Sequence, residues 1–322
     1  PVHVGGVIVS HATLHNMDEI KRLDLKIGDT IIIERAGDVI PKVIQTLPNL
    51  RSGREKEIKI PIRCPMCDSG VVKITGEVAY RCANIDCYAV NLRKLTHWAS
   101  KGAVDIDGLG PKIIEQLMKE GLVNNISDFY DLEEGDLKPL ERFADKSSKN
   151  LIEAINSKKE IDLAKFIYGL GIRHVGEETA ITLAQHFGSL AKIEQANLED
   201  FDGLPDFGEI MAKSIYQWFR DKRNIDLLKK LKSKGVITKE VEKNTKNLTL
   251  KGKTIVLTGT LSSLTRDEAK AKIRGLGGDI SSAVSKKTDL LIAGNEPGSK
   301  YDKALELGVK IIDEEEFLKM IK

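Results

Sequence analysis

Long apolar runs and an excess of charge are both missing from this sequence of 322 residues. No apolar stretch approaches the roughly 18 residues that would indicate a transmembrane helix. No signal peptide is visible, and this favours a reducing cytoplasm. The net charge is only +2, so any basic surface for nucleic acid must be local. A chain of this length is expected to form two to four domains.

Signatures of catalysis are also missing. The sequence has no Walker loop, no Rossmann fingerprint and no cluster of carboxylates, and its histidines form no catalytic set with a nucleophile. The chain lacks an initial Met as well, and it enters a strand-like run, residues 2–9, directly after Pro1. We therefore expect a fragment of a longer protein.

Cysteine is rare and confined to one place. All four cysteines lie between positions 64 and 87, as the pairs Cys64-Pro-Met-Cys67 and Cys82-Ala-Asn-Ile-Asp-Cys87. Two close pairs on tight turns have the spacing of a four-thiolate zinc site. Two disulfides are the alternative, but nothing else in the chain looks secreted. The spacing predicts one zinc ion, which by itself does not define a function.

Residues 1–62 are predicted to be rich in β-structure. The strand-forming runs are residues 7–9, 30–33 and 39–44. Pro41 favours an edge strand or a bulge. Asn16 followed by Glu19 predicts a capped helix over residues 17–23. Short strands with one small helix are typical of a small barrel such as the OB-fold, a common platform for nucleic acids.

Residues 91–235 have a helical period and an internal repeat. Four dipeptides recur at nearly equal intervals along this region: Leu109-Gly110, Phe143-Ala144, Val175-Gly176 and Phe207-Gly208. Each precedes a predicted helix whose fourth residue is small or aliphatic. These fourth residues are Ile114, Ser148, Ala180 and Ala212. The repeating unit is predicted to be a helix, a tight hairpin and a second helix.

The glycines of this repeat indicate anion binding. A glycine that opens a helix lets backbone N–H groups approach an anion closely, and the helix dipole adds positive charge. The natural anion is a nucleic-acid phosphate, which carries no sequence information. The fitting copies are Asp107-Gly108-Leu109-Gly110, Arg173-His174-Val175-Gly176 and Asp206-Phe207-Gly208. Ordinary helix–helix turns also favour glycine, but three such hairpins in register favour DNA binding.

The second copy of the repeat departs from this pattern. Arg142 and Ala144 stand where the other copies have glycines. We therefore expect this copy to be structural, although Arg142 and Lys146 could still meet a phosphate.

The last part of the chain alternates strands with helices after a polar linker, residues 236–249. The predicted strands are residues 253–257, 290–292 and 309–312, and the predicted helices are residues 266–276, 300–307 and 314–321. This alternation predicts a small α/β domain with a parallel sheet.

Several of these motifs together resemble the bacterial NAD-dependent DNA ligases. Residues 104–117 (VDIDGLGPKIIEQL) and 170–176 (LGIRHVG) look like the helix-hairpin-helix domain of that family. Residues 12–16 (ATLHN) and 35–41 (RAGDVIP) resemble its OB domain, and the cysteines match its zinc finger. One departure is Cys87-Tyr-Ala-Val90, where the family usually has Cys-Pro-Ala-Gln. The zinc ligands survive this change, but the turn after them is expected to differ.

The resemblance implies further site residues. Arg35, Val39 and Ile40 would lie on the OB surface that meets DNA near the nick. Arg35 stands beside a turn, and from there its planar guanidinium could bind a phosphate. The alternative is that the Arg35 side chain is solvated and binds nothing.

Residues 250–322 resemble a BRCT domain, through the segments LTGT (257–260), GG (277–278), TDLLIAG (288–294) and GSKYDKA (298–304). BRCT domains that bind phosphate use positions filled here by Thr258, Gly259, Arg266 and Lys300. A hydroxyl, a backbone N–H and two cations at helix starts form a plausible clamp. The alternative is that Thr258 and Gly259 serve the fold and the cations face water.

The family's nucleophile is a lysine in a Lys-x-Asp-Gly motif, which this sequence lacks; the nearest string is Asp105-Ile-Asp-Gly108. The resemblance therefore implies that NAD and magnesium are bound mainly by an adenylation domain absent here, and that this segment, with no catalytic residue of its own, is inactive alone. It would form the DNA-clamping C-terminal portion of a ligase that seals nicks in replication and repair, binding backbone without sequence specificity. We expect a monomer in the bacterial cytoplasm, associated with the nucleoid and not with a membrane.

The predicted fold is multidomain α+β. It comprises an OB-fold β-barrel truncated at its start (1–62), a small four-cysteine zinc finger (63–90), an all-α helix-hairpin-helix domain with four repeats (91–235), a linker (236–249) and an α/β BRCT domain (250–322). Two other functions stay open on the residues alone. They are a stand-alone DNA-binding or scaffold protein and a subunit of a DNA-repair nuclease. A Lys-x-Asp-Gly motif upstream of Pro1 would identify a ligase.

Overall fold

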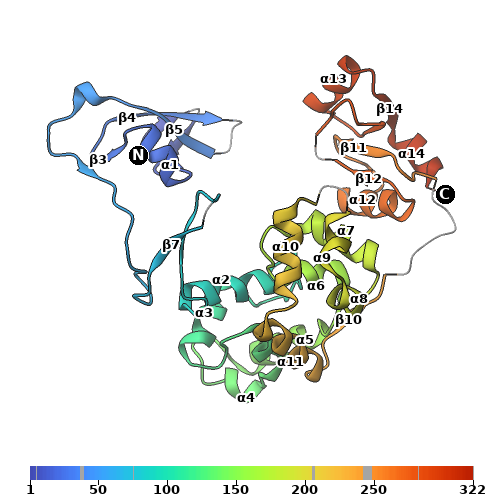
Figure 1. Ribbon diagram of the computed structural model, residues 1–322, viewed down its shortest axis with the longest axis horizontal. Helices are drawn as coiled ribbons and strands as arrows, with labels where there is room; N and C mark the ends of the chain where they lie inside the picture. Colours follow the sequence, from blue (N-terminus) through green and yellow to red (C-terminus); the bar gives the residue numbers. More distant parts are fainter. Residues whose placement is uncertain are drawn as a thin grey trace. The chain divides into compact units, whose positions relative to one another are not determined.

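The computed structural model describes residues 1–4, 6–36, 40–74, 76–204, 207–241, 249–281 and 283–321, and these form two compact units (Figure 1). Unit 1 comprises Pro1–Ala184 and Ser189–Lys239, and unit 2 comprises Gln185–Gly188 and Glu240–Lys322. Within the described residues, no helix combines the length and the apolar character that a membrane span requires.

The N-terminal part of unit 1 is built from short antiparallel strand pairs. The strands are β1 (Val2–Val4), β2 (Val7–Val9), β3 (Lys26–Ile27), β4 (Ile31–Ala36), β5 (Ile40–Thr46) and β6 (Lys56–Glu57). They pair as β1 with β2, β3 with β6 and β4 with β5. The predicted strand over residues 2–9 is therefore two strands, because the chain turns at Gly6, whose φ is +79°.

One short helix, α1 (Met17–Arg22), and a 3-10 turn, η1 (Pro48–Leu50), complete this part. Asn16 caps α1: its Oδ1 accepts a hydrogen bond from the N–H of Glu19 at 2.9 Å. The helix predicted from Asn16 and Glu19 is confirmed to within one residue.

Arg51 forms two ion pairs in this part, which has a small apolar core. Arg51 donates from Nε to Asp29 at 2.7 Å and from Nη1 to Asp24 at 2.7 Å. The Arg51 guanidinium lowers the pKa of Asp29 to about 2. The buried side chains described here are Val9, Leu23, Val43 and Thr46. Several aliphatic side chains, including Ile8 and Ile27, are exposed.

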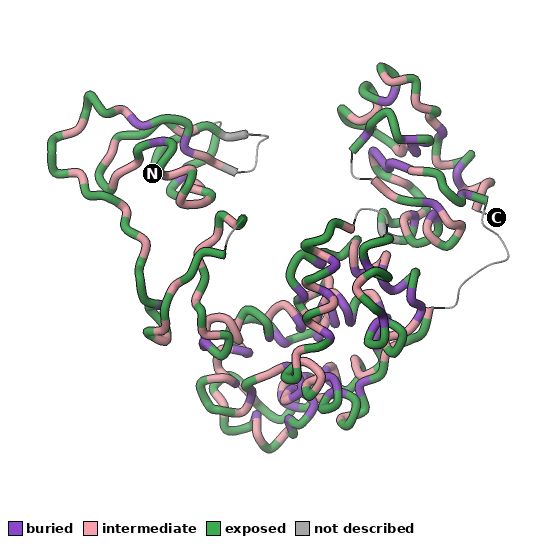
Figure 2. Tube along the Cα trace, viewed as in Figure 1, coloured by how far each residue is buried: buried purple, intermediate pink, exposed green. Residues whose placement is uncertain are grey.

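A hairpin of β7 (Val71–Lys73) and β8 (Tyr80–Cys82) follows, and helices form most of the rest of unit 1, so the predicted all-α domain is all-α except for one pair of short strands. These are α2 (Tyr88–Ala99), α3 (Pro111–Lys119), η2 (Ile126–Asp131), α4 (Glu134–Leu137), α5 (Asp145–Ser157), α6 (Leu163–Gly169), α7 (Glu177–Phe187), α8 (Leu190–Gln195), α9 (Leu198–Asp202), α10 (Glu209–Trp218) and α11 (Lys222–Ser233). Figure 2 shows buried residues recurring along these helices. The largest fully buried side chains there include Trp98, Phe129 and Phe201.

The start of the predicted linker is instead a strand. Strand β10 (Ile237–Lys239) pairs in parallel with β9 (Glu160–Asp162), and the N–H of Ile237 donates to the carbonyl of Lys159 at 2.8 Å. Val236 is buried just before it. The pairing partner lies far earlier in the sequence, so the local polar composition gave no sign of this strand. Residues 242–248 of the predicted linker lie outside the described residues.

Unit 2 contains the predicted parallel sheet. Its elements are β11 (Thr254–Thr258), α12 (Arg266–Gly275), β12 (Asp279–Ile280), β13 (Leu290–Ala293), α13 (Ser299–Glu306), β14 (Lys310–Asp313) and α14 (Glu314–Met320). The strand order is β12-β11-β13-β14, and every pair is parallel.

Both faces of this sheet are covered, as the continuous apolar strands require. Ile255, Leu257 and Ile292 pack with residues of α12 and α14 on one face. Val256 and Leu291 pack with residues of α13 on the other face. Thr265 and Glu268 form a capping box that starts α12.

Candidate nucleic-acid interface and metal centre

The four cysteines of unit 1 form one cluster. Their sulfur atoms all lie within 4.8 Å of one another. Cys64 Sγ is 3.8 Å from Cys87 Sγ, and Cys67 Sγ is 3.4 Å from Cys82 Sγ. Tetrahedral zinc with Zn–S bonds of about 2.3 Å holds its sulfurs about 3.8 Å apart. All four cysteines are free, so the disulfide alternative is wrong and the sulfurs fit one zinc ion.

Tight turns place these sulfurs. The N–H of Asp68 donates to the carbonyl of Cys64 at 2.9 Å, and the N–H of Cys64 donates to the carbonyl of Ser69 at 2.7 Å. Hydrogen bonds from Ser69 lower the pKa of Cys67 to about 6, which favours a thiolate. Burial raises the pKa of Cys82 to about 12, so a metal has to displace a proton there.

The departure after Cys87 leaves the helix intact. Cys87 is the N-cap of α2, and Tyr88 occupies its first helical position. Proline is favoured there because its missing N–H has no partner in a helix anyway. Tyrosine keeps that N–H, so the helix starts at the same place without the fixed backbone angle of proline.

The four predicted hairpins share one backbone hydrogen bond. In each, an N–H donates to the carbonyl three residues earlier, and the four pairs recur at the same nearly equal intervals as the dipeptides. These pairs are Leu109 to Ile106, Phe143 to Leu140, Val175 to Ile172 and Phe207 to Leu204, at 3.1–3.3 Å. A helix begins two residues after each of these donors, and the four helices are α3, α5, α7 and α10. The predicted repeat is therefore present in the structure.

The residue three positions before each helix start is also equivalent where it is described. Gly108, Arg142 and His174 have φ values of +77°, +69° and +65°. Asp206, the fourth member, lies outside the described residues. The small or aliphatic fourth residues of the helices are all buried: Ile114, Ser148, Ala180 and Ala212.

The glycines before the helices are not required by the fold. Gly110 and Gly208 have φ values of −79° and −90°, which any residue adopts. A Cβ built on Gly110, Gly176 or Gly208 meets no atom within 4 Å. Ala144 caps α5 at the equivalent position with a Cβ in place. Open space at three exposed glycines therefore leaves room for something outside this chain.

Arg173 of the third hairpin already has partners within the chain. Its Nη2 forms an ion pair with Glu77, from the loop between β7 and β8, and Glu77 also accepts from Arg81 Nε at 3.4 Å. Ser214 Oγ of α10 donates to the carbonyl of Arg173 at 2.9 Å and links the third hairpin to the fourth. Sequence reasoning missed Glu77, because no local pattern marks a contact between segments so far apart in the chain.

The OB residues expected to meet DNA are only partly described. Arg35 and Ile40 lie at the facing ends of β4 and β5, where Arg35 is paired with Pro41 and Ile40 with Ala36. Their side chains and the whole of Val39 lie outside the described residues.

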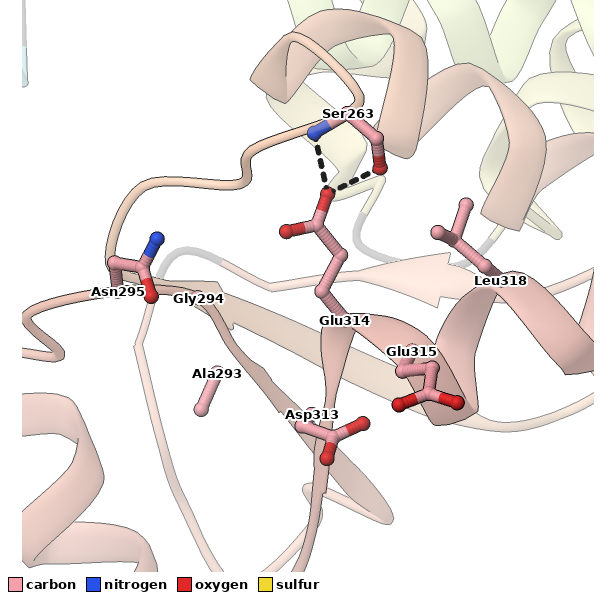
Figure 3. Close-up of a pocket in the computed structure, with 8 residues that line it drawn as sticks. All are labelled: Ser263, Ala293, Gly294, Asn295, Asp313, Glu314, Glu315 and Leu318. Carbon is pink, nitrogen blue, oxygen red and sulfur yellow. Dashed lines mark hydrogen bonds between the residues drawn. The ribbon is translucent and has the colours of Figure 1, made fainter.

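Unit 2 has a cavity of about 450 Å³ at the carboxyl ends of β13 and β14 (Figure 3). Its lining includes Asp313, Glu314 and Glu315. Glu314 is engaged by the loop after β11: it accepts from the N–H groups of Ser262 at 2.6 Å and Ser263 at 2.8 Å. These bonds lower the pKa of Glu314. A cavity with this acidic lining does not suit a phosphate.

The four predicted phosphate residues of unit 2 are absent from that lining. Arg266 donates from Nη2 to the carbonyl of Leu257 at 2.8 Å, which uses one of the five N–H donors of its guanidinium. Gly259 has a φ of +73°, and a Cβ there would lie 2.6 Å from the carbonyl oxygen of Asn295, so glycine is required for packing. Thr258 is 5% exposed. Lys300 lies half-buried in the first turn of α13.

Comparison with protein families matches four regions of the chain. Residues 1–55 match the NAD-dependent DNA ligase OB-fold domain, and residues 63–89 match the NAD-dependent DNA ligase C4 zinc finger domain. The chain therefore carries domains of the NAD-dependent DNA ligases. Residues 165–228 match the helix-hairpin-helix motif, and residues 245–321 match the BRCA1 C Terminus (BRCT) domain. The resemblance to these ligases and the predicted set of folds are confirmed.

Curated relatives agree with the ligase domains. The chain is 47% identical over 322 residues to a DNA ligase of Thermoanaerobacter pseudethanolicus, covering all of this chain and 49% of that protein. It is 48% identical over 325 residues to a DNA ligase of Acetivibrio thermocellus, of which 49% is covered. It is 47% identical over 321 residues to a DNA ligase of Geotalea uraniireducens, of which 48% is covered. The chain thus spans about half the length of the curated relatives it matches.

Proposed function

We propose that this chain is the DNA-binding C-terminal part of an NAD-dependent DNA ligase that seals nicks in duplex DNA during replication and repair. The observation that carries the proposal is the open space at Gly110, Gly176 and Gly208, each directly before a helix. Since relatives over the whole chain are named DNA ligases, neither a scaffold protein nor a nuclease subunit is favoured.

The chemistry of the hairpins supports phosphate as their ligand. The first N–H groups of a helix have no partner within the helix, and the dipole makes that end positive. A glycine without Cβ lets a phosphate oxygen approach these donors. Contacts of this kind position a duplex without reading its sequence. Arg35, Val39 and Ile40 of the OB domain would add contacts near the nick.

We place adenylation outside this chain. NAD and magnesium would be bound by an adenylation domain upstream, and the lysine that takes AMP would lie there. This chain, acting as a monomer in the bacterial cytoplasm at the nucleoid, would hold the duplex while that domain acts. Zinc would keep the finger folded and take no part in a reaction step.

A binding titration tests the proposal. The isolated chain should bind nicked and intact duplexes of unrelated sequence with similar affinity. The logarithm of its affinity should fall linearly with the logarithm of the salt concentration, because phosphate contacts release counterions. Fluorescence anisotropy at several salt concentrations measures both properties. A strong preference for one sequence, or an affinity independent of salt, would contradict the proposal.

The same titration tests a phosphate contact in unit 2 at Lys300, because Arg266 also hydrogen-bonds to the carbonyl of Leu257. Lys300→Ala should lower the salt slope by about 1 on DNA that bears a 5′-phosphate. Lys303→Ala, one helical turn further along α13, is the matched control. Equal slopes for both variants and the wild type would favour a solvated Lys300.

Because adenylation is placed outside this chain, we expect the chain to form no covalent AMP adduct. The adduct requires a lysine whose amine is deprotonated by its surroundings. No lysine of this sequence stands in a Lys-x-Asp-Gly motif. Mass spectrometry after incubation with NAD and magnesium should show an unchanged mass. A gain of one AMP would place a nucleophile in this chain and overturn the assignment.

A further inference from the structure

Glu77 lies on a hairpin loop of the zinc finger and has its side chain only 20% exposed. The loop turns at Gly76, whose φ is +85°, and the N–H of Glu77 donates to the carbonyl of Ile74 at 3.0 Å. The carboxylate is held between two guanidinium groups, those of Arg81 on β8 and Arg173 on the third hairpin.

Arg173 is a residue for which DNA phosphate and Glu77 are rival partners. A guanidinium fork binds carboxylate and phosphate through the same geometry. The Arg173 side chain is 44% exposed, so water and DNA can reach it. Its backbone is fixed independently, because Ser214 holds its carbonyl and the N–H of Val175 closes the hairpin. Only the guanidinium therefore has to change partner.

We propose that Glu77 is an intramolecular competitor of DNA: its carboxylate occupies the Arg173 guanidinium in the DNA-free chain, and a backbone phosphate displaces it on binding. This inference rests on the proposed function of the hairpins. A carboxylate and a phosphate on one guanidinium repel each other, so binding at the third hairpin costs the release of Glu77. Glu77 keeps Arg81 as a partner after release, which makes the exchange reversible.

The experiment compares Glu77→Gln with Glu153→Gln in the full chain, by anisotropy with a nicked duplex. Glu153 is an exposed carboxylate of α5 whose nearest cation, Lys149, is 3.8 Å away, so its replacement removes the same charge without freeing a hairpin residue. Glu77→Gln should bind about two- to fivefold more tightly than Glu153→Gln, which is the range expected for a partly exposed ion pair. Circular dichroism should show the same helix content for both variants.

A double-mutant cycle assigns the effect to Arg173. In the background of Arg173→Gln, the Glu77 and Glu153 variants should bind equally, because no guanidinium remains to be released. Equal or weaker binding of Glu77→Gln in the wild-type background would overturn the competitor role while leaving the hairpins intact. A gain that persists without Arg173 would overturn it too. A wild-type chain that fails to bind duplex at all would overturn the proposed function together with this inference.

Discussion

Gly110→Asp and Gly176→Asp are each expected to weaken duplex binding by roughly 30-fold, or about 2 kcal/mol, which is the size of a lost hydrogen bond to a charged group. The new side chain would fill the open space in front of the helix and bring a carboxylate to the position proposed for phosphate. The protein itself should tolerate the change, because nothing within 4 Å of either Cβ position has to move. Asp is also a preferred N-cap residue, so helix stability should not fall.

The second copy of the repeat provides the matched control for this experiment. Ala144 caps α5 in the same way, and it already carries a Cβ. Its N–H already has a local partner, because it donates to Ser147 Oγ at 2.7 Å, and Asp145 beside it pairs with Lys138. Ala144→Asp should therefore change duplex affinity only slightly. Equal losses at positions 110, 144 and 176, with helix content unchanged by circular dichroism, would contradict phosphate binding by the glycine hairpins.

The hairpins and the metal centre could be predicted from the sequence because each depends on residues that lie close together in the chain. A glycine, an apolar residue before it and a small or aliphatic residue four positions later fix a turn and a helix start locally. The spacing of Cys64, Cys67, Cys82 and Cys87 similarly depends on two turns of a few residues. The alternation of strands and helices in unit 2 has the same local character, and the elements predicted there lie within two residues of their observed bounds.

Features that depend on distant partners could not be predicted in this way. Strand β10 exists because β9 offers it a backbone edge, and its own composition resembles a linker. The ion pair of Glu77 with Arg173 joins two segments that share no pattern. The hydrogen bond from Arg266 to the carbonyl of Leu257 is likewise a contact that only the packing of unit 2 reveals.

The zinc finger has almost no apolar core of its own. Cys64 and Cys87 are the buried residues among those described in residues 63–87. Most of the large apolar side chains of this segment face solvent: Met66, Val72, Ile74, Val78 and Ile85 are all more than a third exposed. A segment that buries so little cannot offset the entropy of ordering its backbone. Metal–sulfur bonds must therefore supply most of its stability, on the order of 10 kcal/mol at neutral pH for small structural sites.

Zinc removal should consequently unfold the finger and leave the helices that follow it folded. Metal analysis of the purified chain should give about one zinc, as four ligands for one ion require. After chelation, hydrogen exchange should speed up at the amides of Cys64, Val71 and Ala83, which are closed by the turns and strands of the finger.

The first turn of α2 should also fray after chelation, because Cys87 caps that helix. The last turn should stay protected, because Leu95 and Trp98 are buried in the helical part of unit 1. Cys67→Ser should reproduce the effect of the chelator, whereas Ser69→Ala, which removes a neighbour of Cys67 and no ligand, should retain zinc. If the chelated chain kept slow exchange throughout the finger, packing and not metal would hold this segment together, and the zinc would have another purpose.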